Sequence, residues 1–159
     1  GAALQGFLSG STSLAISVGS WKDPLFQPAA HIARLLAEKM PGTDCLPNPV
    51  LLNVNLPNLP LDQIKGVEIT RVSSRKNTDA IHEGYDGKRR YYWIVHQKPQ
   101  WDPDPGTDRW ALKQNYISIT PFLSHVSLGS VASILHELAP SLYQQLMAIN
   151  PTQDATAPA

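Results

Sequence analysis

The stretch PVLLNVNLP, residues 49–57, decides the fold, because it is an apolar strand bounded by prolines. Upstream of it, SLAISV (13–18) is a second short apolar strand. Between the two, apolar residues recur every three or four positions from Pro28 to Met40, which predicts an amphipathic helix lying on a sheet. A strand, a helix and a strand in this order predict an α/β layer with parallel strands.

The start of the chain also has a helical pattern. In GAALQGFLSG (1–10), Leu4, Phe7 and Leu8 have helical spacing, and Gly10 is placed to end the helix. No initiator methionine or polar lead-in precedes this helix. We therefore expect the sequence to be the C-terminal fragment of a longer protein.

Beyond Pro60 the pattern changes to short strands with no long helical pattern between them. These segments are GVEITRV (66–72), RRYYWIVH (89–96) and NYISITP (115–121), and they predict antiparallel hairpins, with a loop between His96 and Thr107. The segment 130–149 predicts a closing helix, which Pro140 should kink or split. We expect one domain over 1–150, with the α/β layer at 1–58, hairpins and the closing helix at 59–150, and a disordered tail at 151–159.

Composition excludes several classes of protein. The 159 residues carry 13 basic and 13 acidic side chains, which argues against nucleic-acid and anionic-membrane binding. The single cysteine, Cys45, excludes an internal disulfide framework and a cysteine-based zinc site, and suits the cytoplasm. No run approaches the ~20 apolar residues of a membrane span.

Few residues suggest chemistry directly. The histidines lack metal-ligand spacing, no nucleophile elbow or phosphate-binding glycine loop is present, and Lys88 to Arg90 predict a solvated hairpin tip. Asp102, Asp104 and Asp108 lie on one loop, but the proline between the first two, Pro103, keeps them from wrapping one ion.

The remaining candidate is the turn at the start of PGTDRWALKQNYISITP (105–121), which precedes a spacer and an alternating strand. Gly106 permits a tight turn, and the side chains of Thr107 and Asp108 can hydrogen-bond to backbone groups. A structural role therefore already accounts for both residues.

Several sequence segments, in the order in which they occur here, resemble the SurE family of survival-protein nucleotidases. They are GAALQGFLSGSTSLAISV, LLNVNLPNLPLDQIKGVEITR, YYWIV and PGTDRWALKQNYISITPF, and together they span about Gly1 to Phe122. The resemblance implies a three-layer α/β sandwich with a Rossmann-like layer and a hairpin-rich C-terminal part. Two positions depart from the family pattern: Gln5 replaces the usual glutamate, and Asn115 replaces a usual glycine.

The same resemblance implies a function. The intact protein would be a divalent-metal-dependent phosphomonoesterase, with Mg or Mn, that hydrolyses nucleoside 5′- and 3′-monophosphates. The family's metal ligands come from an Asn-Asp-Asp-Gly stretch, a later serine and a Ser-Gly-x-Asn phrase, and none of these can be matched here. We therefore expect no catalytic or metal-binding residue in this chain, and the fragment alone should be inactive.

The chain itself would contribute a loop and an assembly surface. Gly106, Thr107 and Asp108 would form a loop at the mouth of the substrate site, mainly as a brace. The hairpins and C-terminal helix would form a homo-oligomer, either a dimer or a tetramer. The alternative is a non-catalytic assembly or binding module that keeps the scaffold. Zero net charge argues against nucleic acid as the partner.

Overall fold

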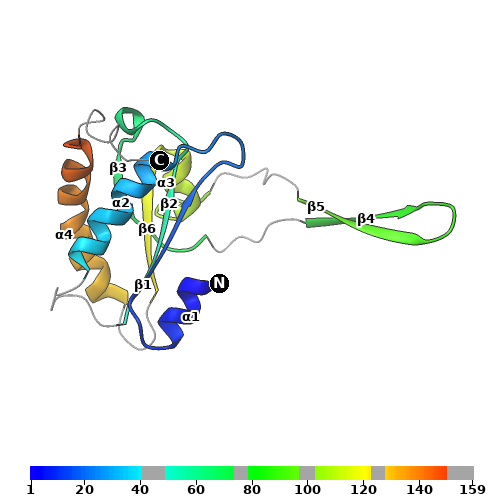
Figure 1. Cartoon of the computed structure of the whole chain (residues 1–159), viewed down its shortest axis with the longest axis horizontal. Coiled ribbons are helices and arrows are strands. Elements are labelled where there is room, and N and C mark those ends of the chain that lie inside the picture. The colour runs from blue at the N-terminus through cyan, green and yellow to red at the C-terminus, as the bar shows by residue number, and fades with distance from the viewer. Residues whose placement is uncertain (41–48, 74–78, 97–102, 123–127, 150–159) are drawn as a thin grey trace, which may run out of the picture.

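A strand–helix–strand unit forms the first half of the sheet in the computed structural model, which describes residues 1–40, 49–73, 79–96, 103–122 and 128–149 (Figure 1). Strand β1 (Ser13–Val18) pairs in parallel with β2 (Leu51–Leu56), and α2 (Phe26–Lys39) connects them. The apolar residues of α2 that were spaced at three and four positions, such as Ile32 and Leu36, are buried. The predicted parallel α/β layer is therefore confirmed.

The second half of the sheet comes from residues beyond Pro60. Strands β3 (Gly66–Ile69) and β6 (Tyr116–Phe122) complete a four-stranded sheet of order β1-β2-β6-β3. Strand β6 is antiparallel to β2 and parallel to β3. This pairing differs from the hairpins expected for these two segments, because each finds its partner far away in the sequence. Segments on both sides of Pro60 thus share one sheet.

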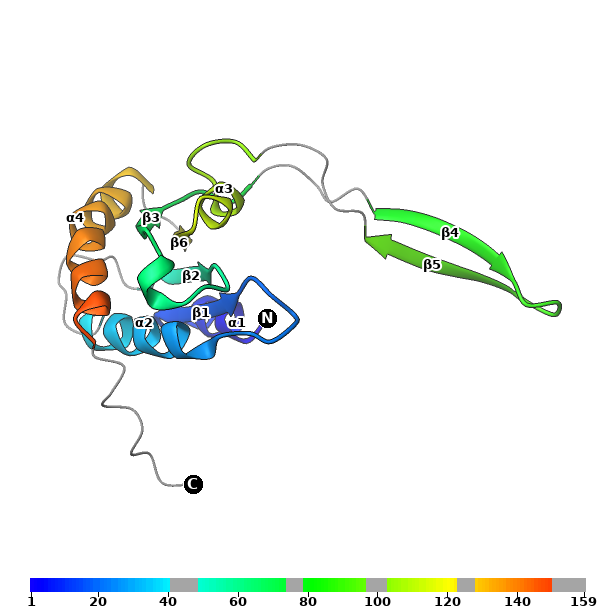
Figure 2. The same ribbon diagram turned by 90° about the horizontal axis from the view of Figure 1, so that it is seen from above.

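Helices cover both faces of the sheet, as Figure 2 shows from above. Helices α2 and α4 (Leu128–Met147) pack on one face, and α1 (Ala2–Leu8) and α3 (Asp108–Lys113) contact the other. The main core lies under α2 and α4, where Val54 and Ile119 of the sheet meet Ile32 and Leu135 of the helices. The three-layer α/β class predicted from the sequence is confirmed.

Helices α1 and α4 test the predictions about glycine and proline. Gly10 has φ +87°, and its N–H donates to Phe7 O while Ser11 N–H donates to Gly6 O, so α1 ends where expected. Helix α4, by contrast, runs through Pro140 without a break. Pro140 is exposed while neighbouring Ala139 and Leu142 are buried, so packing of the apolar stripe outweighs the proline's cost.

One hairpin forms and extends away from the sheet (Figure 2), but its first strand lies in the polar stretch for which no strand was predicted. Strands β4 (Asp79–Tyr85) and β5 (Arg90–His96) pair antiparallel, with Tyr85 opposite Arg90 next to the turn. At the tip, the Asp86 carboxylate accepts hydrogen bonds from the N–H groups of Lys88 (2.8 Å) and Arg89 (2.7 Å). Lys88 to Arg90 are exposed, as predicted for a solvated tip.

The hairpin carries large apolar and aromatic side chains that face solvent. Tyr91 and Trp93 make an edge-to-face contact with ring centroids 5.9 Å apart. Tyr92, Trp93 and Ile94 are each more than 60% exposed. The tail predicted to be disordered, 151–159, and Cys45 lie outside the described residues.

Candidate functional site

The Gly-Thr-Asp turn precedes a short helix rather than an irregular spacer. Gly106 has φ +76°, a conformation that favours glycine, and α3 begins at Asp108 directly after the turn. Thr107 is the N-cap of this helix: its Oγ1 donates to Asp104 O at 2.6 Å and accepts from Trp110 N–H at 3.4 Å. Thr107 is fully buried, so both bonds are shielded from water.

The same turn is bound to the chain segment that follows β3. Arg71 N–H donates to Gly106 O, and Asp108 N–H donates to Arg71 O, each at 3.0 Å. The Asp108 carboxylate accepts from Ser73 N–H at 3.0 Å and from Arg109 N–H at 2.8 Å. Gly106 and Asp108 therefore hold two segments of chain together through backbone groups, while Thr107 fixes the turn itself.

A buried cluster of hydroxyl groups lies on the face of the sheet that α1 and α3 contact. Thr70 Oγ1 is 2.7 Å from Ser118 Oγ and 2.7 Å from Thr120 Oγ1. All three residues are buried. Sequence reasoning missed this cluster, because alternating polar residues in a strand look the same whether they face solvent or another layer.

This face of the sheet is polar across its full width. In-register neighbours on the four strands form a row of Ser17, Asn55, Ser118 and Glu68. Ser17 Oγ donates to Asn55 Oδ1 at 2.7 Å. The row offers hydroxyl, amide and carboxylate groups, whereas the opposite face carries the apolar core.

The structure also describes most of the other residues considered for chemistry. Within the described ranges, no three His, Cys, Asp or Glu residues are grouped so that they could hold a metal ion. Asp104 and Asp108 lie on the turn described above, while Asp102 is outside the described residues. His31 is half-buried on α2, as expected for a packing residue. No helix in the described part of the chain is long and apolar enough to cross a membrane.

A parallel strand–helix–strand unit within a sheet that helices cover on both faces defines a three-layer α/β protein. Residues 1–79 match the family model described as survival protein SurE. The chain belongs to the SurE family.

Curated relatives with the name 5′-nucleotidase SurE match most of this chain. The relative from Synechococcus sp. (strain JA-3-3Ab) is 40% identical over 76% of this chain and 46% of its own length. The relative from Legionella pneumophila (strain Paris) is 34% identical over 86% of this chain and 56% of its own length. The chain therefore spans about half the length of the curated relatives it matches.

A solved structure supports the same relationship. The crystal structure of the SurE protein from Aquifex aeolicus has a TM-score of 0.65 and 28% sequence identity to this chain. The match covers 86% of this chain and 55% of the Aquifex chain. The fold described above is thus shared with a solved member of the family.

Proposed function

We propose that the intact protein is a divalent-metal-dependent phosphomonoesterase that hydrolyses nucleoside 5′-monophosphates, and also 3′-monophosphates. The observation that carries the proposal is the similarity to relatives named 5′-nucleotidase SurE, at 34–41% identity over at least 75% of this chain. Because the chain spans about half of those relatives, the activity is proposed for the intact protein rather than for these 159 residues.

The metal ion, Mg²⁺ or Mn²⁺ in this proposal, would not be held by the described residues alone. They contain no group of three acidic, histidine or cysteine side chains with the geometry of an ion site. Divalent ions of this kind need several oxygen ligands at once. The proposal therefore assigns the ligands mainly to residues outside this chain.

The test is release of inorganic phosphate from nucleoside 5′- and 3′-monophosphates. The intact protein should release phosphate with added Mg²⁺ or Mn²⁺ and lose this activity in EDTA. The 159-residue chain alone should release none. A folded intact protein that is inactive on every nucleoside monophosphate would instead support a non-catalytic assembly module.

Within the intact protein, we assign Gly106, Thr107 and Asp108 to a loop that braces the mouth of the substrate site. The hydrogen bonds that Thr107 and Asp108 make to backbone groups support this role. The variant Asp108→Asn would distinguish a bracing role from direct contact with the substrate. A brace predicts that thermal stability and kcat fall together, whereas a substrate contact predicts a raised KM with unchanged stability.

We also propose that copies of the chain form a homo-oligomer, a dimer or tetramer, through the β4–β5 hairpin and α4. The exposed Tyr92, Trp93 and Ile94 on the hairpin support this, because apolar groups gathered on an extended arm gain from burial. Sedimentation should detect the oligomer, and Trp93→Ser with Ile94→Ser should dissociate it. Leu8→Ser, on the exposed side of α1, is the matched control and should leave the oligomer intact.

A further inference from the structure

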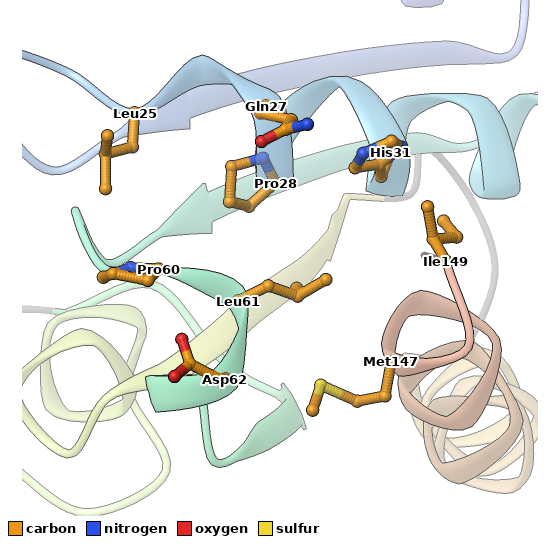
Figure 3. A pocket seen from close by; sticks show the side chains of 9 residues that line it. All are labelled: Leu25, Gln27, Pro28, His31, Pro60, Leu61, Asp62, Met147 and Ile149. Carbon is orange, nitrogen blue, oxygen red and sulfur yellow. The ribbon is translucent and has the colours of Figure 1, made fainter. Parts of the chain in front are cut away.

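A cavity of about 410 Å³ lies between the start of α2, the turn before the short 3-10 helix η1 (Leu61–Gln63) and the end of α4. Figure 3 shows the side chains that line it. Its volume is in the range of sites for small molecules, which are mostly apolar with a few polar groups. Leu25 and Pro28 line one wall, and Leu61, Met147 and Ile149 line the others.

Hydrogen bonds between the surrounding elements fix these walls. Leu25 N–H donates to Asn58 Oδ1 at 2.7 Å, and Asn58 Nδ2 donates to Asp23 O at 3.2 Å. The loops that follow β1 and β2 are thereby joined. On the other side, Tyr143 OH donates to Ile64 O at 2.7 Å and ties α4 to the end of η1. The cavity is thus built from elements that are already held in place, which lowers the entropic cost of binding.

The cavity wall contains few polar side chains. Gln27 and His31 project from α2, and Asp62 projects from η1 (Figure 3). In that view, Asp62 lies near Pro60 and Leu61, across the cavity from Ile149. Among the described residues that line the cavity, none is lysine or arginine. The wall therefore offers an exposed carboxylate at one end, and the apolar Met147 and Ile149 together with His31 at the other.

We propose that this cavity binds a small organic cation with an apolar or aromatic body. The cationic head hydrogen-bonds to the Asp62 carboxylate, an acceptor that favours charged donors. The body lies against Leu61 and reaches Met147 and Ile149. An anionic ligand of the same shape is disfavoured, because it would place a like charge beside Asp62.

The experiment compares two indole ligands of similar shape and opposite charge on the intact protein. Tryptamine carries an ammonium group, and indole-3-propionate carries a carboxylate. Amide chemical shifts in a ¹H–¹⁵N titration report both affinity and position. Tryptamine should bind saturably and shift residues 25–31, 60–62 and 147–149, and indole-3-propionate should bind at least about fivefold more weakly.

Two variants with matched controls test the assignment to this cavity. Asp62→Asn should weaken tryptamine binding about fivefold and remove most of the difference between the ligands, while Asp86→Asn at the exposed hairpin tip should change neither. Leu61→Trp should fill the cavity and abolish binding of both, while Leu8→Trp on exposed α1 should not.

The proposal would be overturned by no saturable shift with tryptamine, by equal affinity for both ligands, or by shifts confined to the aromatic hairpin. If Leu61→Trp fails to fold, the Asp62→Asn comparison still decides, because that substitution preserves side-chain size. Retention of full tryptamine affinity in folded Asp62→Asn would rule out the carboxylate as the recognition group.

Discussion

Replacing Thr70 with valine should destabilise the protein strongly, although the two side chains have nearly the same shape. Thr70 Oγ1 is the shared partner of Ser118 Oγ and Thr120 Oγ1, both at 2.7 Å. In the native structure, none of the described buried side-chain polar atoms lacks a hydrogen-bond partner. Thr70→Val would leave two buried hydroxyl groups without one, since Ser118 and Thr120 are at most 2% exposed.

The magnitude follows from the cost of unsatisfied buried groups. Each costs about 1–3 kcal/mol, so Thr70→Val should lower the free energy of unfolding by about 3 kcal/mol. Ser118→Ala should cost only about 1 kcal/mol, because the Thr70–Thr120 bond survives. The triple variant Thr70→Val, Ser118→Ala, Thr120→Val removes every hydroxyl of the cluster. Since replacing all partners by apolar groups is nearly neutral, it should be more stable than Thr70→Val alone.

Urea denaturation followed by tryptophan fluorescence measures these differences, with unchanged m-values showing that the variants unfold from comparable native states. Ser17→Ala is the matched control, because it removes an exposed hydroxyl on the same face of the sheet and should change stability by less than about 0.5 kcal/mol. A triple variant that is less stable than Thr70→Val would refute the reasoning, because the cost would then come from lost hydroxyl bonding rather than from orphaned partners.

Three other predictions concern local backbone structure. Thr107→Val should lower the free energy of unfolding by about 1–2 kcal/mol, because it removes the N-cap and the hydrogen bond to Asp104 O. Thr107→Ser keeps the hydroxyl group and should cost less. Equal losses for the two variants in urea denaturation would contradict this. Asn115 has φ +68°, so Asn115→Gly should stabilise by about 0.5 kcal/mol in the same assay, whereas Gln114→Gly, at φ −89°, should not. Hydrogen bonds from the N–H groups of Arg89 and Lys88 lower the pKa of Asp86 in the folded protein. The ionised carboxylate should therefore stabilise the turn fully at any pH above the pKa of Asp86 in the unfolded chain, and this stabilisation should be lost as pH falls through the lower pKa of the folded state. An NMR titration midpoint for Asp86 at or above that of an unfolded peptide would contradict this.

The elements with clear periodicity could be predicted from sequence, but their neighbours in the sheet could not. The pattern at 28–40 and the apolar runs at 13–18 and 49–57 predicted α2, β1 and β2, because each depends on burial of one local face. Helix α3 was missed because six residues contain too little periodicity and prolines precede them. The insertion of β6 between β2 and β3 depends on non-local pairing, which no local pattern encodes.

The Gly-Thr-Asp turn could be predicted from the sequence, whereas the cavity could not. Thr107 and Asp108 stood out because turn residues have local signatures, and their bonds to backbone groups were predicted correctly. The cavity gave no signal, because Leu25, Leu61 and Met147 belong to segments far apart in the chain. Only packing of α2 and α4 on one face of the sheet brings them together.

The bonds around the Gly-Thr-Asp turn indicate what the turn does for the rest of the molecule. The chain runs from Ser73 into the part that contains the β4–β5 hairpin and returns at Pro103, just before the turn. Ser73 N–H and Arg71 bind the turn directly, so the segment that leaves β3 and the segment that enters α3 are joined next to the sheet. The same segment carries Thr70, which is bonded to β6 through the buried hydroxyl groups. Loosening Asp108 should therefore weaken the link between the end of β3 and the start of α3, the two points between which the chain carries the β4–β5 hairpin.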